Sequence, residues 1–347
     1  MKRILAKVSL SVIMIASSLA VNSQACTRVM CESNDRVITS RSMDWEENIP
    51  TSLWIFPKGM ERNGGIDKNS ITWKSKYGSV VAVGFNSVTG DGMNEKGLVA
   101  NLLWLSEADY GKSTKPTLSI GAFAQYILDL YSSVDEAVKN LEKLNFQIVA
   151  PVLPGDDANA AMHVTISDSS GDSAVIEFIE GQMVINHSRM YKVATNSPVY
   201  DQQLSINSYW EDVGGNAMLP GTHRPADRFA RASFYTNSIT QTKLYKNEKM
   251  AVSRAFSIIR EASVPLGIKI VNEGPVPSTI WRTISDQKAL KYYFDPVVSP
   301  SSFWVDIKKL NLKDGANVKT LDLTEYPNYS GEVSKKFVNS KPFEWLK

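Results

Sequence analysis

The alternation of apolar and polar residues predicts three blocks of strands separated by two pairs of helices. The first two strands, residues 27–32 and 36–41, are joined by Asn34 and Asp35 and form a hairpin. Short runs rich in β-branched and aromatic residues predict the other strands at 52–56, 71–73, 80–85, 98–105, 164–166, 174–179, 183–185, 192–195, 278–286 and 290–294.

Apolar residues at helical spacing predict helices over residues 118–131, 225–236 and 249–261. Ser133, with Glu136 three residues later, has the form of a capping box and predicts another helix. The polar stretches that remain are interpreted as a loop, a turn and an irregular segment at 58–69, 91–97 and 200–222. Helix pairs between runs of strands favour one α+β domain with layered sheets.

The first 25 residues have the pattern of a secretory signal. A positive start precedes a mostly apolar stretch at 8–21, and Ser23-Gln24-Ala25 puts small residues where a signal peptidase cuts. We therefore expect a periplasmic or secreted protein whose single domain spans residues 26–347. The later sequence holds no run of 18 apolar residues, so no membrane span is expected.

Cleavage after Ala25 gives Cys26 a thiol and a free α-amine on the same residue. An α-amine titrates near pH ~8, so its neutral form can act as a base at neutral pH. A nucleophile that uses its own amine in this way is an established catalytic solution. Two other readings of Cys26 remain: an ordinary structural cysteine, or the lipid-bearing cysteine of a lipoprotein, although Ser23 stands where that signal usually has Leu.

Charge and composition narrow the function classes. Without the three basic residues of the leader, the 38 basic and 36 acidic residues of the chain leave a net charge of −1, which gives no electrostatic case for nucleic acid. The two cysteines, Cys26 and Cys31, would lie ~16 Å apart along one strand, so they are expected as free thiols. The three histidines have no paired spacing, so neither a metal site nor a cofactor is predicted.

Four polar residues fit a cysteine hydrolase. A positive neighbour favours the thiolate, and Arg41 can supply that charge. Asp44 can accept a hydrogen bond from the amine, and the side-chain amide of Asn196 can donate to an oxyanion. Arg228 can steady the charges around Asp44 or the nucleophile. Taken singly, each also fits a surface pair, a turn or a solvated helix face.

Together with Cys26, these residues lie in motifs that resemble the choloylglycine hydrolase family. The motifs are Arg41-Ser42-Met43-Asp44-Trp45, Asp91-Gly92-Met93-Asn94-Glu95-Lys96-Gly97-Leu98, Thr195-Asn196-Ser197-Pro198 and Arg228-Phe229, and residues 279–294 resemble the late strand block of the family. The resemblance covers nearly the whole chain after the leader. The chain departs from the family pattern at 104–110, where a backbone oxyanion donor is expected, so that donor is not assigned.

The resemblance implies a four-layer αββα sandwich of the N-terminal nucleophile hydrolases and cleavage of a linear amide C–N bond in a small-molecule N-acyl amide. It implies Cys26 as nucleophile and amine base, the residues Arg41, Asp44, Asn196 and Arg228 in catalytic positions, and a homotetramer. The leader resembles the Gram-negative penicillin V acylase-like branch, some members of which deacylate N-acyl homoserine lactones.

Two tryptophans bear on the substrate. Trp45 follows Asp44, and Trp104 ends a strand expected near the site, so their indoles can form an apolar slot for a phenoxyacetyl or fatty acyl group. Core packing is the alternative reading of both. A bile salt hydrolase remains the alternative enzyme, and a lipid-anchored periplasmic binding protein is the alternative of another class.

Overall fold

The computed structural model describes residues 25–33, 36–154, 159–239, 247–270, 274–325, 327–341 and 343–345. The expected leader and the turn at Asn34 and Asp35 lie outside the described residues, except for Ala25. In the part of the chain that is described, no helix is long and apolar enough to cross a membrane.

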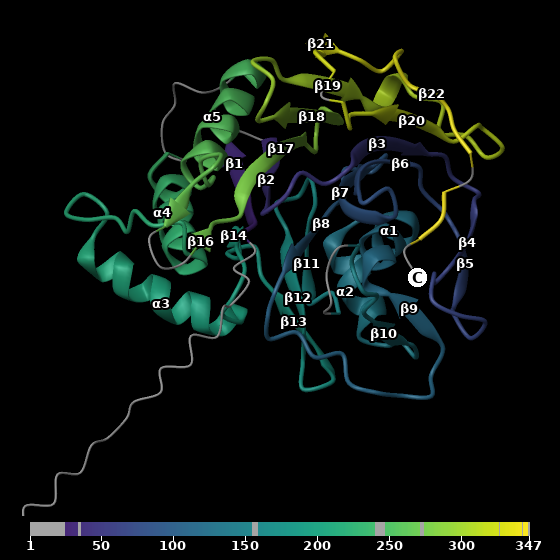
Figure 1. The fold of residues 1–347 in the computed structure, drawn as a ribbon, viewed down its shortest axis with the longest axis horizontal. Helices are drawn as coiled ribbons and strands as arrows, with labels where there is room; N and C mark the ends of the chain where they lie inside the picture. Colours follow the sequence, from purple (N-terminus) through teal and green to yellow (C-terminus); the bar gives the residue numbers. More distant parts are fainter. Residues whose placement is uncertain are drawn as a thin grey trace, which may run out of the picture.

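Two large sheets form the centre of the described chain (Figure 1). The seven-stranded sheet has the order β14 (Val193–Ala194), β1 (Thr27–Ser33), β2 (Arg36–Trp45), β17 (Ser278–Asp286), β18 (Lys291–Pro296), β19 (Phe303–Asp306) and β21 (Gly331–Glu332). The nine-stranded sheet has the order β13 (Gln182–His187), β12 (Ser173–Ile179), β11 (Met162–Ser167), β8 (Val99–Trp104), β7 (Val88–Asn94), β6 (Ser79–Gly84), β3 (Thr51–Phe56), β20 (Lys319–Asp322) and β22 (Val338–Asn339).

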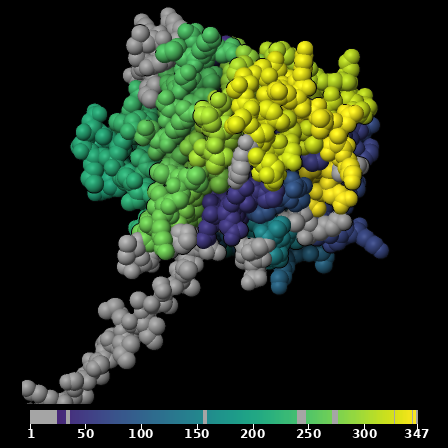
Figure 2. Space-filling model, turned by 45° about the horizontal axis from the view of Figure 1, so that its top comes forward, coloured from purple at the N-terminus to yellow at the C-terminus, as the bar shows by residue number. Residues whose placement is uncertain are grey.

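Smaller elements complete the fold. The short strand pairs are β9 (Thr117–Ser119) with β10 (Gln147–Val149), β15 (Lys269–Ile270) with β16 (Gly274–Pro275), and β4 (Glu61–Asn63) with β5 (Thr72–Lys74). A 3₁₀ turn, η1, spans Ile307–Lys309. Figure 2 shows the C-terminal part of the chain, in yellow, beside the purple N-terminal part. The strand β20 pairs with β3.

Helices cover the outer face of each sheet, which gives four layers (Figure 1). The helices α1 (Ile120–Leu130) and α2 (Val134–Leu141) pack on the nine-stranded sheet. On the other side, α4 (Pro225–Ile239) and α5 (Glu248–Glu261) pack on the seven-stranded sheet, with α3 (Tyr200–Val213) beside α4. The layers are therefore helix, sheet, sheet, helix, as predicted.

Apolar side chains fill the space between the layers because each sheet buries both faces. One cluster lies between the two sheets and includes Met43, Leu53, Val80 and Phe294. Cys26 belongs to this cluster. The nucleophile proposed from the sequence thus lies inside the sandwich and not on its surface.

Several local predictions are confirmed, and others are wrong. Ser133 caps α2, because its hydroxyl accepts the backbone N–H of Glu136 at 3.2 Å. The predicted turn at 91–97 is wrong, since β7 continues to Asn94 and the turn begins at Glu95. Polar residues obscured this strand: the Asn94 side chain is buried and donates to two carbonyls of the α1 end, at 2.9 and 2.8 Å.

The irregular segment predicted at 200–222 is also wrong, because its first part forms α3. Few side chains of this helix are buried; they are Tyr200, Gln203 and Asn207. Two of the three are polar, so no apolar stripe marks the helix in the sequence. The predicted loop at 58–69 contains β4, and β2 extends past the predicted end at 41 to Trp45.

Candidate active site

The hairpin of β1 and β2 places Cys26 beside the residues predicted to surround it. Thr27 pairs with Ser42, so the two strands bring Cys26 next to Met43 and Asp44. Cys26 is 2% exposed. Its neighbour Ala25, still joined to it by a peptide bond, is buried against Val264 and Val276. Local pairing alone thus accounts for one side of the site.

Arg41 lies against the thiol. Its Nη2 lies 3.6 Å from Cys26 Sγ and also donates to Leu102 O at 2.9 Å. Its guanidinium carbon lies 4.7 Å from the centre of the Trp281 ring. The Nε and Nη1 atoms of this buried side chain have no hydrogen-bond partner among the described residues. The guanidinium of Arg41 therefore lies next to the sulfur inside the sandwich.

Asn196 contacts the backbone nitrogen of Cys26 from a segment 170 residues away. Its Oδ1 accepts the Cys26 N–H at 2.5 Å and also accepts Arg228 Nη2 at 2.8 Å. These two donors identify Oδ1 as the oxygen, and Nδ2 donates one hydrogen to Trp104 O at 2.8 Å. The second hydrogen of Nδ2 is available for another acceptor.

Arg228 joins the helices to the site. It is fully buried on α4, and its Nη1 donates to Cys26 O at 2.7 Å and to the Thr27 hydroxyl. The same nitrogen lies 3.9 Å from Asp44 Oδ2. Burial lowers the pKa of Arg228, and the charge of Asp44 opposes that shift.

Asp44, the residue after Met43 on β2, is fully buried. The hydroxyl of Thr279 donates to its Oδ1, and the hydroxyl of Ser42 lies 3.4 Å from its Oδ2. Burial raises the pKa of Asp44 to about 6, although Arg228 and the Thr279 bond favour the charged form. The expected contact of Asp44 with the Cys26 nitrogen is made by Asn196 instead.

The four predicted partners of Cys26 therefore come together from β2, the end of β14 and α4. The sequence analysis did not identify Thr279 as a site residue, because it named this residue only as the start of the late strand block at 279–294. Its hydroxyl reaches Asp44 because Thr279 pairs with Asp44 across β17 and β2. Only the register between β17 and β2 identifies Thr279 as a partner of Asp44, and no local sequence pattern reveals that register.

A cavity opens at the thiol. It is small, about 20 Å³, which is room for about one water molecule. Its walls include Cys26, Arg41, Met43, Trp45, Phe85, Val88, Leu102, Trp104 and Met162. The rings of Trp45 and Trp104 meet edge to face with centroids 6.2 Å apart. Both tryptophans line the cavity, and the wall is mostly apolar.

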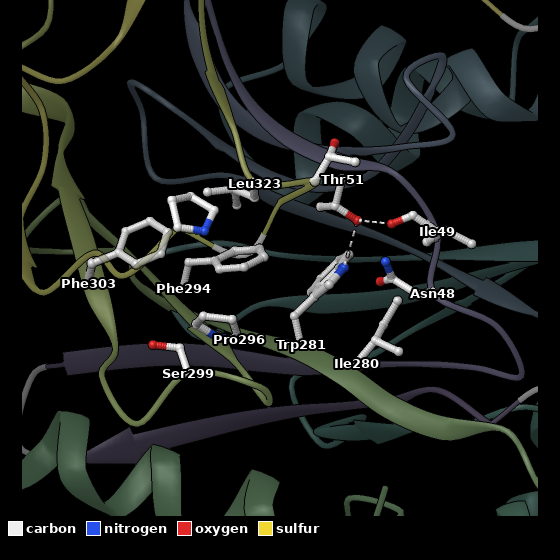
Figure 3. Close-up of a pocket in the computed structure, with 12 residues that line it drawn as sticks. Asn48, Ile49, Thr51, Ile280, Trp281, Phe294, Pro296, Ser299, Phe303 and Leu323 are labelled. Atoms are coloured by element: carbon white, nitrogen blue, oxygen red, sulfur yellow. Dashed lines mark hydrogen bonds between the residues drawn. The ribbon is translucent and has the colours of Figure 1, made fainter. Parts of the chain in front are cut away.

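A second apolar pocket lies between the sheets near the start of β17 (Figure 3). Ile280, Trp281, Phe294 and Leu323 line it, and the indole N–H of Trp281 donates to the Thr51 hydroxyl at 3.2 Å. The Trp281 ring also contacts Arg41, which lines the cavity at the thiol. No thiol or buried carboxylate lines the second pocket.

The described residues hold no group of three or more His, Cys, Asp and Glu side chains able to bind a metal ion. Both cysteines are free. Burial raises the pKa of Cys31 to about 11, which keeps it as a thiol within the core. Cys26, by contrast, lines the cavity, with Arg41 Nη2 at 3.6 Å from its sulfur.

Comparisons with known proteins agree with this geometry. A family model described as linear amide C–N hydrolases, choloylglycine hydrolase family, matches residues 26–326. A penicillin V acylase from Pectobacterium atrosepticum is 47% identical in an alignment that covers 97% of this chain and 96% of the relative. A bile salt hydrolase/transferase from Lactiplantibacillus plantarum is 29% identical over 59% of this chain and 68% of its own length.

A solved structure of penicillin V acylase from Agrobacterium tumefaciens superposes with a TM-score of 0.85. It is 47% identical and covers 92% of this chain and 99% of its own. The predicted N-terminal nucleophile hydrolase fold is thereby confirmed, as is the predicted activity class. By family match, sequence identity and fold, the chain belongs to the choloylglycine hydrolase family and is a linear amide C–N hydrolase.

Proposed function

We propose that this hydrolase is an exported acylase of the penicillin V acylase type that removes an aromatic or straight acyl chain from an amide nitrogen. One observation carries the proposal: Cys26 presents its sulfur to Arg41 and its nitrogen to Asn196, at the wall of a cavity lined by two tryptophans. The names of the two relatives at 47% identity support the choice of substrate class.

In the proposed first step, the free α-amine of Cys26 takes the thiol proton, and the sulfur attacks the carbonyl carbon of the substrate amide. The positive charge of Arg41 stabilises the thiolate. The second hydrogen of Asn196 Nδ2 and a backbone N–H near the end of β8 stabilise the oxyanion. Collapse of this intermediate breaks the C–N bond, and the protonated amine gives its proton to the leaving nitrogen.

In the second step, water hydrolyses the thioester. The α-amine accepts a proton from the water as its oxygen attacks the acyl carbon, and it returns that proton to the departing sulfur. The products are a carboxylic acid and a free amine. Asp44 and Arg228 act on the charge and orientation of the Cys26 terminus, because both are buried within contact of its backbone or of each other.

The scheme requires that the Ala25–Cys26 bond is cut. The signal-like leader and the start of the family match at Cys26 support cleavage there and a periplasmic or secreted location. Since Ala25 is buried in the folded chain, a signal peptidase would cut before the domain closes over it. A homotetramer belongs to the same proposal and rests on the family resemblance.

A substrate panel and an intact mass test the proposal. The purified protein is incubated with penicillin V, with long-chain N-acyl homoserine lactones, and with glycine- and taurine-conjugated bile salts, and the released amines are quantified. We expect turnover of the first two classes and a mass that begins at an unmodified Cys26. Turnover by a chain that retains Ala25 or carries a blocked amine would contradict the scheme.

A bile salt hydrolase is the second candidate, supported by the relative at 29% identity. Faster release of glycine or taurine than of the penicillin nucleus would favour it. For the lipid-anchored binding protein, the readout is an added diacylglyceryl group on Cys26 without turnover of any amide. The mass and the panel therefore separate the three hypotheses.

A further inference from the structure

Asn196 lies beyond the strand that leads to it. The pairing of β14 with β1 ends at Ala194, so the sheet does not hold the next residues. Side chains bind this segment instead. Gln203 of α3 donates to Asn196 O at 3.1 Å and to Ser197 O at 2.9 Å. The placement of the Asn196 side chain therefore depends on groups outside its own strand.

His163 is one of these groups, and it comes from the other sheet. It lies on β11, and its Nε2 is 2.9 Å from Thr195 O, the carbonyl directly before Asn196. A carbonyl oxygen only accepts, so Nε2 carries the hydrogen. His163 is 2% exposed, so this bond joins the two sheets inside the sandwich.

Glu177 on the neighbouring strand β12 completes the arrangement. Its Oε1 lies 3.6 Å from His163 Nδ1 and accepts the backbone N–H of Tyr200 at 2.9 Å. Tyr200 begins α3, so the two side chains contact both ends of the segment 195–200. Both side chains are buried, so the hydrogen bonds from His163 to Thr195 O and from Tyr200 N to Glu177 are shielded from water. Hydrogen bonds shielded in this way are electrostatically stronger.

We propose that His163 and Glu177 are positioning residues that fix Asn196 for the reaction. They touch neither the thiol nor the substrate cavity, and they act through the backbone that carries Asn196. A shift of Thr195 would move Asn196 Oδ1, which holds the Cys26 nitrogen. The kinetic part of this inference rests on the proposed function, whereas the position of Asn196 does not.

Two polar substitutions, whose side chains differ in length, test the hydrogen bond from His163 to Thr195 O. In His163→Gln the amide nitrogen reaches the place of Nε2, whereas in His163→Asn it reaches only that of Nδ1. With penicillin V as probe, we expect His163→Gln to keep kcat within about threefold of the wild type. His163→Asn should lower kcat by about 10- to 100-fold with little change in KM, because a displacement of about 1 Å has that cost.

Ser167→Ala is the matched control. Ser167 lies on the same strand β11, is equally buried, and also crosses between the sheets, since its hydroxyl is 2.7 Å from that of Thr39. Its removal should lower the melting temperature but leave kcat unchanged. A loss of kcat in Ser167→Ala as large as in His163→Asn would overturn the proposal, as would full kcat in His163→Asn.

A crystal structure of His163→Asn supplies a readout that needs no turnover. We expect Asn196 Oδ1 to move away from the Cys26 nitrogen, and an unmoved Asn196 would overturn the positioning role. If the wild type cleaves neither penicillin V nor the N-acyl homoserine lactones, the proposed function fails while this measurement still decides. Glu177→Leu, which removes the anchor of Tyr200 N, gives a second chain in which the same displacement is expected.

Discussion

Two buried aspartates, Asp44 at the nucleophile and Asp129 on α1, face an arginine in very different surroundings. Asp129 accepts from the Trp73 indole at 2.8 Å and from Gln125 at 2.7 Å, and it pairs with Arg62 at 3.3 Å. The Arg62 guanidinium also lies 4.2 Å from the Phe56 ring. This cluster connects β4, β5 and α1, so its partners are parts of the scaffold.

Asp44 has one close donor, Thr279, and its arginine partner is 3.9 Å away. Nearby, two nitrogens of Arg41 have no hydrogen-bond partner among the described residues, although the side chain is buried. Burial raises the pKa of both aspartates. Arg62 also has two nitrogens without a hydrogen-bond partner among the described residues, so the difference lies in what each arginine faces. Arg62 pairs with Asp129 at 3.3 Å, whereas Arg41 lines the cavity at the thiol, where its nitrogens can meet charge that develops on a substrate.

The largest expected effect comes from the nucleophile. Cys26→Ala should lower turnover by at least about 10⁴-fold, because no other thiol lies at the cavity, and the chain should still fold. Turnover assays measure the loss of activity, and circular dichroism shows whether the variant is folded. Cys31→Ala is the matched control, a buried cysteine away from the cavity, and it should keep its activity. Full turnover by Cys26→Ala would remove the distinction between the two regions.

The next effect falls on stability at the other cluster. Asp129→Ala should destabilise the protein by about 3–5 kcal/mol, because it leaves the charge of Arg62 buried and unpaired. Urea unfolding measures the loss. The folded fraction should turn over at the wild-type rate, since Asp129 does not line the cavity. A lower kcat in fully folded Asp129→Ala would show that the scaffold cluster also serves the reaction.

The pH dependence of Asp44 sharpens the comparison. With a pKa of about 6, its carboxylate is lost as pH falls through 6, so kcat/KM should decline there. Stability changes in the opposite sense. The pKa exceeds the ordinary 3.8, so the stabilising neutral form is fully present below about pH 4, and its contribution is lost as pH rises through 6.

In Asp44→Asn, both dependences should disappear, along with most of the activity. The change in unfolding free energy between pH 4 and pH 7 should shrink by up to about 3 kcal/mol relative to wild type. Urea titrations at several pH values measure it. An unchanged pH profile of stability in Asp44→Asn would mean that another group titrates in this range.

The smallest effect concerns the acyl group. Trp45→Leu should raise KM for penicillin V by about tenfold, with kcat nearly unchanged, because an aromatic contact of about 1 kcal/mol is lost along with apolar area. Trp54→Leu is the control, since Trp54 packs edge to face on Phe343 and does not line the cavity. Equal KM values in the two variants would argue against a binding role for Trp45.

Some of the site could be predicted because its signals are local. The β1–β2 hairpin brings Arg41 and Asp44 to Cys26 through the pairing of neighbouring strands, and the capping residue of α2 is read from four positions. By contrast, Thr279 lies 235 residues from Asp44, and only the cross-strand register joins them. His163 has no other histidine at the spacing of a metal-binding or catalytic motif, and its partner is a backbone carbonyl, so no sequence pattern singles it out.

The sequence by itself determined the layered α+β class, the identity of the nucleophile candidate and the residue types that a thiolate and an oxyanion require. The tertiary structure alone decided that Asn196, and not Asp44, holds the Cys26 nitrogen, and that a polar segment forms α3. The physical reason is that local patterns specify which face of an element is buried. Which atoms meet inside the sandwich depends on the packing of all four layers together.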